Sequence, residues 1–276
     1  MRILLPTDYS DHAYHAAQYA AGLMGVEHVS YVLVHTYMDA DPSVTSWGSM
    51  AEELYRAANE GMVHWLERIR GSEAFRGAKV GKDVVFGPLT GVLNEMAREK
   101  SADLVVMGTQ GRSGGGLLGS NAASVVKQCH VPVLVVPSKA GLNGVHRILF
   151  ADDQRRVKPH DLKMLLHIAL RTRAEVVLAH VLRNAEELPR TALVALFDEL
   201  LQAVPHRYVS EEGKDVAGTI DMLAEREGAA MIAVLHRHAG FLEDLFRIST
   251  AKRLALHTNL PLLVMQHEGN GDDDLP

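Results

Sequence analysis

Residues 2–8 read RILLPTD, and residues 147–153 read RILFADD, so an apolar run that leads to an aspartate occurs twice in the chain. Three more pairs follow in the same order: VLVH at 32–35 with VLAH at 177–180, ADLVVM at 102–107 with AAMIAV at 229–234, and VPVLV at 131–135 with LPLLV at 260–264. Chance matching of apolar residues would produce one or two such pairs, but not an ordered set. The sequence therefore predicts two copies of one folding unit, joined near residues 138–145, which have no apolar period.

Each copy alternates short apolar runs with longer stretches of helical period. In the first copy the short runs are too brief for helices and are typical of buried strands; they occupy residues 2–6, 29–36, 80–86, 103–107 and 131–136. Helices are expected at 10–24, 49–70, 90–100 and 119–129, with Ser10 as an N-cap and Ser49 with Glu52 as a capping box. This alternation predicts an α/β chain of two tandem, open, five-stranded parallel-sheet domains with helices on both faces.

The length and composition fit two globular domains. The chain has 276 residues, 47% of them hydrophobic and 22% charged, with a net charge of −6. This mildly acidic balance argues against nucleic acid or an anionic membrane as the main partner. A single cysteine, Cys129, allows no intrachain disulfide, and neither a signal peptide nor an apolar run of about 18 residues is evident. We therefore expect a cytoplasmic protein with no membrane segment, whose residues 268–276 form a disordered acidic tail.

Two features follow strands at the edge where open parallel sheets bind their ligands. One is the sequence PTD at 6–8, and the other is the glycine-rich stretch GTQGRSGGGLLGSN at 108–121. Glycines let the backbone approach an anion closely, and the N-terminus of the following helix favours negative charge. The Ser120 hydroxyl and the Arg112 cation would add to a phosphate site. The alternative is a surface loop with an ordinary helix cap, and the loop alone does not decide between them.

Other phosphate-binding motifs fit this chain poorly. The stretch 114–120 has the G-x4-G-S spacing of a P-loop, but it lacks the lysine and follows the fourth strand instead of the first. No G-x-G-x-x-G follows the first strand, so a dinucleotide fold is not supported. No nucleophile with a neighbouring base, and no pair of acid and base residues, stands out.

The combined motifs resemble the universal stress protein family in its tandem, two-domain form. The resemblance rests on PTDYS at 6–10, ADLVVMGTQGR at 102–112, the pair GS at 119–120 and VPVLVVP at 131–137. It covers residues 1–138 and, more weakly, 146–267, with a linker at 139–145. It implies adenine nucleotide alpha hydrolase-like (HUP) domains that form a pseudo-dimer within one chain, and it suggests that two chains form a homodimer.

The resemblance also implies a site for ATP or ADP, with or without Mg²⁺, in the first domain. By that analogy Asp8 meets the adenine beside Pro6, Thr7 and the backbone of Thr36. The ribose and phosphates lie against Met107, Gly108, Gln110, Gly111, Arg112, Gly119, Ser120 and Asn121. The loop departs from the family spacing because seven residues, instead of nine, separate Gly111 from Gly119. The choice among ATP, ADP and AMP therefore stays open, and Asp8 has the alternative role of capping the first helix.

The second domain departs further from the nucleotide-binding pattern. The sequence LHRH at 235–238 replaces the first glycine pair, and Ile248-Ser249 replaces the later Gly-Ser. Side chains at these positions would crowd a phosphate, so we expect a second domain without nucleotide. His236 and His238 lack a third ligand and are interpreted as loop histidines rather than as a metal site.

Two other features are interpreted as structural. His35 and His180 recur at the end of the second strand of each copy, which indicates a shared packing or hydrogen-bonding role. Cys129 is expected to be a packed thiol.

The sequence thus favours a non-enzymatic stress or regulatory protein that binds an adenine nucleotide in its first domain. Two alternatives stay open. One is a nucleotide-free universal stress protein that acts as an interaction module through its fifth strands. The other is a slow ATPase, which the missing lysine makes the weakest of the three.

Overall fold

The computed structural model describes residues 1–37, 47–109, 119–141, 144–182, 191–237 and 260–267. The chain divides into two compact units, Met1–Ser138 and Lys139–Pro276. The predicted acidic tail at 268–276 lies outside the described residues, and the predicted linker at 139–145 stays a prediction.

The first unit holds a five-stranded parallel sheet. Its strands lie in the order β3-β2-β1-β4-β5, with bounds β1 (Arg2–Pro6), β2 (Ser30–Tyr37), β3 (Lys79–Phe86), β4 (Leu104–Gly108) and β5 (Val133–Val136). The central strand β1 pairs with β2 from Arg2↔Ser30 onward and with β4 at Ile3↔Leu104. Because the chain leaves β1 toward β2 and later returns to β4 on the other side, the carboxyl ends of β1 and β4 form the switch point of the sheet.

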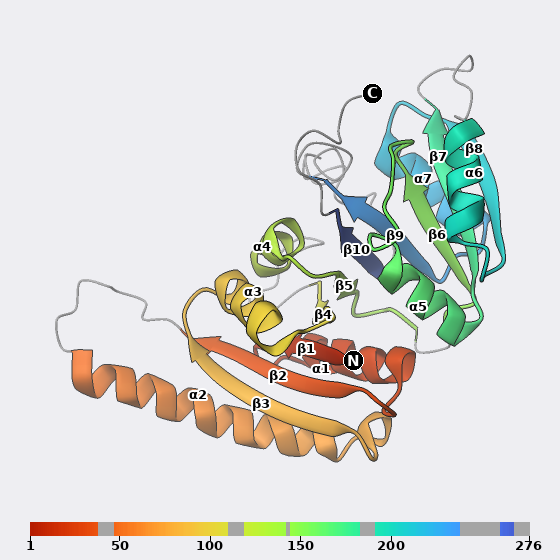
Figure 1. The fold of residues 1–276 in the computed structure, drawn as a ribbon. Helices are drawn as coiled ribbons and strands as arrows, with labels where there is room; N and C mark the ends of the chain where they lie inside the picture. The colour runs from red at the N-terminus through yellow and green to blue at the C-terminus, as the bar shows by residue number, and fades with distance from the viewer. Residues whose placement is uncertain (38–46, 110–118, 142–143, 183–190, 238–259, 268–276) are drawn as a thin grey trace. The chain divides into compact units, whose positions relative to one another are not determined.

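Helices cover both faces of this sheet. Figure 1 shows α1 (Asp11–Met24) and α2 (Trp47–Arg70) on one face and α3 (Leu89–Lys100) and α4 (Ser120–Gln128) on the other, with a 3₁₀ turn at Glu73–Phe75. Ser10 caps α1 as predicted, since its hydroxyl accepts the Ala13 N–H at 3.2 Å. The capping box predicted at Ser49 and Glu52 is wrong, because α2 already begins at Trp47. Serine is tolerated inside a helix, so the pattern alone does not mark a helix start.

The second unit repeats this arrangement. Its strands lie in the order β10-β9-β6-β7-β8, with bounds β6 (Arg147–Asp152), β7 (Glu175–Leu182), β8 (His206–Glu212), β9 (Met231–His236) and β10 (Leu262–Gln266). Its described helices are α5 (Lys163–Thr172), α6 (Thr191–Leu200) and α7 (Val216–Arg226). The strand pairs described within each unit are parallel, and β6 and β9 take the places of β1 and β4. The predicted pair of five-stranded parallel-sheet domains is therefore confirmed.

The central strands are buried on both faces, as a parallel sheet covered by helices requires, whereas the edge strands β3 and β8 are partly exposed. Ile3 and Leu4 of β1, and Ile148 and Leu149 of β6, have no solvent exposure. Cys129 is also buried, as predicted, and burial raises the pKa of its thiol. Among the described residues, no helix combines the length and hydropathy that crossing a membrane requires.

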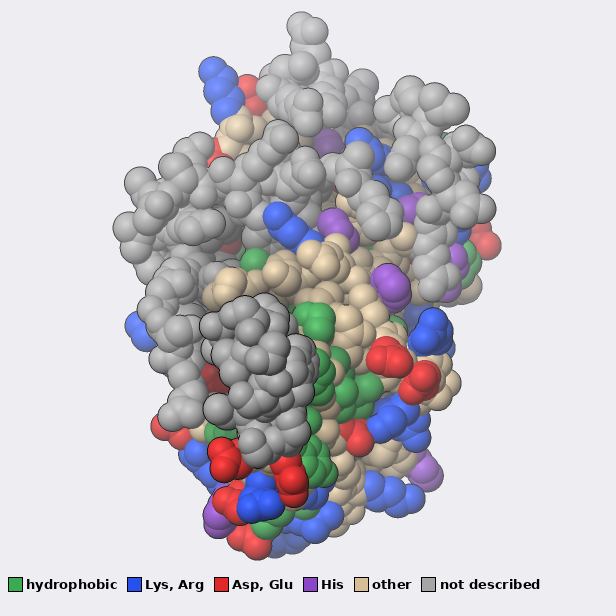
Figure 2. Space-filling view, turned by 90° about the vertical axis from the view of Figure 1, so that its left-hand side faces the viewer, with side chains coloured by type: hydrophobic (Ala, Val, Ile, Leu, Met, Phe, Trp, Pro, Cys, Tyr) green, Lys and Arg blue, Asp and Glu red, His purple; other side chains and the backbone are tan. Residues whose placement is uncertain are grey.

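Charges of both signs are mixed on the surface drawn in Figure 2. Blue Lys and Arg side chains lie beside red Asp and Glu side chains among the described residues of that face. A nucleic-acid surface typically gathers basic residues into one patch. The mixing on this face is consistent with the mild negative net charge of the chain.

The turn that follows β1 is built from its own side chains. The Tyr9 N–H donates to Thr7 Oγ1 at 3.0 Å, and the Ser10 N–H donates to Asp8 Oδ1 at 3.1 Å. The His35 ring joins its Nδ1 to the Thr7 carbonyl at 2.8 Å. Tyr9 takes a left-handed conformation with φ of 64°, which such tight turns impose. The turn therefore holds the Asp8 backbone and one of its carboxylate oxygens in place.

The turn after β6 has the same hydrogen bonds with different residues. The Gln154 N–H donates to Asp152 Oδ1 at 3.0 Å, and the Arg155 N–H donates to Asp153 Oδ1 at 3.2 Å. His180 Nδ1 lies 3.0 Å from the Asp152 carbonyl, and Gln154 has φ of 56°. The shared hydrogen-bonding role that the repeat predicted for the two histidines is thus observed. The structural match makes Asp153 the counterpart of Asp8 and Asp152 the counterpart of Thr7.

Asp152 puts a titratable group where the first unit has a neutral threonine. Burial raises the pKa of Asp152 to about 6, because water no longer solvates the carboxylate. The pKa of an aspartate in the unfolded chain is about 3.9. The ionised Asp152 carboxylate therefore lowers the free energy of unfolding as the pH rises from about 4, and the full loss is reached above about pH 6. As the pH falls toward 4, the folded protein takes up the proton first and this loss disappears.

We predict that Asp152→Asn stabilises the protein at pH 7.5 by on the order of 2 kcal/mol. The asparagine keeps an oxygen for the Gln154 N–H but carries no charge. Urea denaturation should show the gain at pH 7.5 and little difference from the wild type near pH 4. Asp11→Asn, at an exposed carboxylate that begins α1, is the control and should not show this pH dependence. An equal effect of Asp152→Asn at both pH values would contradict the assignment.

Candidate functional site

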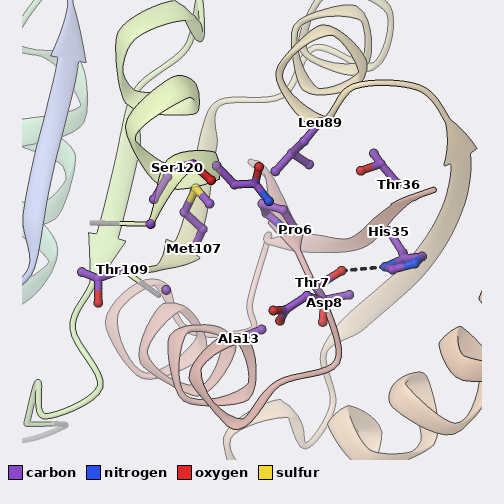
Figure 3. Close-up of a pocket in the computed structure, with 14 residues that line it drawn as sticks. Pro6, Thr7, Asp8, Ala13, His35, Thr36, Leu89, Met107, Thr109 and Ser120 are labelled. Atoms are coloured by element: carbon purple, nitrogen blue, oxygen red, sulfur yellow. Dashed lines mark hydrogen bonds between the residues drawn. The ribbon is translucent and has the colours of Figure 1, made fainter. Parts of the chain in front are cut away.

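A pocket of about 320 Å³ lies at the switch point of the first sheet (Figure 3). Most of the residues predicted from the sequence line it: Pro6, Thr7, Asp8, Thr36, Met107, Gly108, Gly119, Ser120 and Asn121. The other three predicted residues, Gln110, Gly111 and Arg112, lie outside the described residues. The structure therefore brings together, around one cavity, segments that are more than 100 residues apart in the sequence.

Sequence reasoning missed five lining residues: Ala13, His35, Leu89, Thr109 and Ala122. His35 carried a signal, because it recurs as His180, but that signal indicated a structural role. Leu89 follows the Gly87-Pro88 turn that opens α3, so its position beside β1 depends on the fold. Ala13 and Ala122 lie in the first turns of α1 and α4, where a small side chain leaves room for the cavity.

Asp8 provides the carboxylate of the pocket. Its Oδ1 accepts the Ser10 N–H, while Ser10 itself caps α1, so Asp8 is not the cap of that helix. In Figure 3 the Asp8 side chain lies beside Ala13, with Met107 between Asp8 and Ser120 in this view. The carboxylate thus belongs to the pocket lining and is oriented by the turn.

Tyr9 holds the turn in place without being among the residues that line the pocket. Its ring stacks on His35 with centroids 4.4 Å apart and an interplanar angle of 25°, and its hydroxyl donates to the Ala58 carbonyl of α2 at 2.7 Å. Burial raises the pKa of Tyr9 to about 12, so the hydroxyl stays protonated as a donor at neutral pH. Gly61 of α2 makes the approach possible, because an added Cβ there would lie 2.9 Å from Cε2 of the Tyr9 ring.

His35 links this turn to β2. A carbonyl oxygen only accepts, so the hydrogen bond to Thr7 places the proton of the ring on Nδ1 (Figure 3). In the neutral ring Nε2 is then an acceptor. The stacked Tyr9 ring and the hydrogen bond to the Thr7 carbonyl together determine the orientation of the His35 ring.

The N-terminus of α4 forms the opposite side of the pocket. Gly119 is its N-cap and has no side chain to accept the N–H groups of the first turn. The Gly119 N–H donates to the Thr109 carbonyl at 2.7 Å, which ties the start of α4 to the end of β4. Ser120 and Asn121 are exposed to the pocket side. First-turn N–H groups and the helix dipole favour an anion at this position.

The other end of α4 is held by α3. Asn94 donates through Nδ2 to the Gln128 carbonyl at 2.8 Å, and its Oδ1 accepts the His130 N–H at 2.9 Å. The helix is therefore anchored at both ends, and its first turn has a defined position relative to β1.

The middle of the pocket is apolar. Pro6 and Met107 are buried at the ends of β1 and β4, and Leu89 faces them from the start of α3. The described lining contains no lysine or arginine. A flat apolar group with a hydrogen-bond donor would suit the Asp8 end, and a negatively charged group would suit the α4 end.

Comparison with known proteins places the chain in a family. The model of the universal stress protein family matches residues 1–137 and again residues 144–266. Universal stress protein MJ0531 of Methanocaldococcus jannaschii is 34% identical over 142 residues, covering 49% of this chain and 81% of that protein. Universal stress protein G of Salmonella typhimurium is 33% identical over 150 residues, covering 49% of this chain and 96% of that protein.

A solved structure extends the likeness to both units. The crystal structure of a universal stress protein from Archaeoglobus fulgidus covers 96% of this chain and 96% of its own, with a TM-score of 0.72 at 19% identity. That likeness concerns the fold. Together with the two matches of the family model, it shows that the chain belongs to the universal stress protein family in a tandem form.

Proposed function

We propose that the first unit binds an adenine nucleotide, ATP or ADP, and that occupancy of this site regulates the protein in a stress response. One observation carries the proposal. A single pocket joins the oriented carboxylate of Asp8 to the N-terminus of α4, whose N-cap Gly119 supplies no side-chain acceptor. A nucleotide has the matching pair of features, an amine on a flat base and an anionic tail.

The adenine end follows from hydrogen-bonding chemistry. An ionised carboxylate only accepts hydrogen bonds, and the exocyclic amine of adenine only donates them. Leu89 and Met107 supply apolar surface for the base. Guanine presents a carbonyl oxygen at the corresponding position, which Asp8 would repel, so the proposal favours adenine.

The phosphate end depends on backbone groups. Gly119 permits close approach, and the N–H groups at the start of α4 with the Ser120 hydroxyl would bind phosphate oxygens. A bound Mg²⁺ would be held mainly by those phosphates and water, which is its usual mode.

The volume limits the class of ligand. About 320 Å³ is at the lower end of the range for small-molecule pockets, which suits a mononucleotide better than a dinucleotide. The proposal assigns binding and not turnover. Because adenylates are intracellular metabolites, the proposed binding of an adenylate also implies a cytoplasmic location.

The carboxylate test uses Asp8→Ala. ADP that binds only the folded state raises the melting temperature, by the equivalent of about 2.7 kcal/mol at a hundredfold excess over Kd. We predict a clear rise for the wild type and at least tenfold weaker ADP binding for Asp8→Ala, because a hydrogen bond to a charged group is lost. Differential scanning fluorimetry and calorimetry measure both. Asp11→Ala, which removes an exposed carboxylate nearby, should bind like the wild type. Equal binding by Asp8→Ala and the wild type would show that Asp8 is not a contact.

The phosphate test uses Ser120→Asp. A negative charge in the first turn of α4 suits the helix dipole but repels phosphate. We predict about tenfold weaker ATP binding, which corresponds to about 1.4 kcal/mol. Adenosine binding should change by less than about twofold, because adenosine has no phosphates to be repelled. Ser124→Asp adds the same charge one turn further along α4, at an exposed position, and should have a smaller effect on ATP. If Ser120→Asp weakened adenosine and ATP equally, the phosphates would not lie at this helix.

A further inference from the structure

The second unit has a buried arginine beside the turn that matches the ligand turn of the first unit. Arg237 directly follows β9, the counterpart of β4, and its side chain is only 3% exposed. By the sequence repeat it stands where the first unit has Gln110. A buried arginine requires partners for its charge and its N–H groups.

The partners of Arg237 come from the turn after β6. Its Nε donates to Asp153 Oδ2 at 3.1 Å, and its Nη2 donates to the Arg156 carbonyl at 2.7 Å. The Asp153 carboxylate is itself 18% exposed, and its other oxygen accepts the Arg155 N–H. The carboxylate that corresponds to Asp8 therefore has both oxygens engaged within the chain.

The two units thus use one turn in two ways. In the first, Asp8 lines a pocket. In the second, the planar guanidinium donates to Asp153 from the end of the neighbouring strand. A guanidinium resembles the amine edge of adenine, because both are flat and both donate N–H groups to a carboxylate.

We propose that the Arg237 side chain occupies the ligand position of the second unit, and that this is the reason why only the first unit binds an adenylate. The comparison with adenine rests on the proposed function of the first unit, whereas the internal occupancy rests on the Arg237 contacts alone. Arg237 is a specificity-determining residue in this account.

The surrounding charges favour this arrangement. Asp152 ends β6 and Asp153 begins the turn after it, with His180 of β7 beside Asp152 and Arg237 beside Asp153. Burial is the main cause that raises the pKa of Asp152, and the positive charge of Arg237 acts in the opposite direction. Without Arg237 the neighbouring Asp152 and Asp153 carboxylates would lose its compensating charge.

The first experiment is chemical rescue and is independent of adenylate binding. Arg237→Ala should leave a cavity that accepts methylguanidine, so low millimolar methylguanidine should raise the melting temperature of this variant by several degrees more than that of the wild type. Arg226→Ala, which removes an arginine with a 47% exposed side chain in the same unit, is the control and should show no specific rise. If Arg237→Ala were rescued no better than Arg226→Ala, the internal occupancy would be refuted.

The second experiment tests the comparison with adenine. The Asp8→Ala background disables the first site. In this background Arg237→Gln gives position 237 the residue that the first unit has at position 110, and the second unit should then bind adenosine, which the Asp8→Ala protein does not. Adenosine is the probe because it has no phosphates to meet the glycine-poor loop. Asp8→Ala with Arg226→Gln is the matched control, and calorimetry measures binding. Methylguanidine rescue of Arg237→Ala without adenosine binding by the double variant would overturn the equivalence of the two positions. If Arg237→Gln failed to fold, Arg237→Ala, which also removes the internal donor to Asp153, would replace it in the Asp8→Ala background.

Discussion

The hydrogen bond from the His35 ring to the Thr7 carbonyl is the contact on which the site depends. A parallel strand that is buried on both faces must end in a turn whose polar groups find partners nearby. At the end of β1 the side chains of Thr7 and Asp8 accept hydrogen bonds from two backbone N–H groups of the turn. The His35 ring donates to the backbone carbonyl of Thr7. The turn is thereby fixed before any ligand arrives, and its carboxylate has a set direction.

Duplication kept this turn and changed its use. His180 and the carbonyl of Asp152 repeat the contact of His35 and Thr7 with nearly the same length. What differs is the next strand of the switch point. After β4 the chain enters a glycine-rich segment, whereas after β9 it supplies the long, charged side chain of Arg237. Asp153 accepts a hydrogen bond from a buried arginine of the same unit, whereas we propose that Asp8 accepts one from the amine of a bound adenylate.

The repeat and the apolar runs predicted the sheets well, because burial on both faces leaves a clear pattern in the sequence. Most of the proposed site was also predictable, since Asp8 and Ser120 lie at strand ends and helix starts that the pattern marks. The remainder was not. Leu89 lines the pocket because of how α3 packs. Tyr9 packs closely against Gly61 of α2, which is 52 residues away in the sequence. The pairing of Arg237 with Asp153 spans 84 residues and has no local signal. The α2 start was mispredicted because a capping pattern can occur within a helix.

The central proposal is that one turn geometry, used in two ways, gives the chain one adenylate site instead of two. Equilibrium dialysis of the intact wild-type protein against labelled ADP measures this directly, because it counts ligand per chain at saturation. We expect one ADP per chain. Two bound molecules per chain would show that Arg237 does not occupy the second position, and none would show that the pocket at the end of β1 serves another purpose.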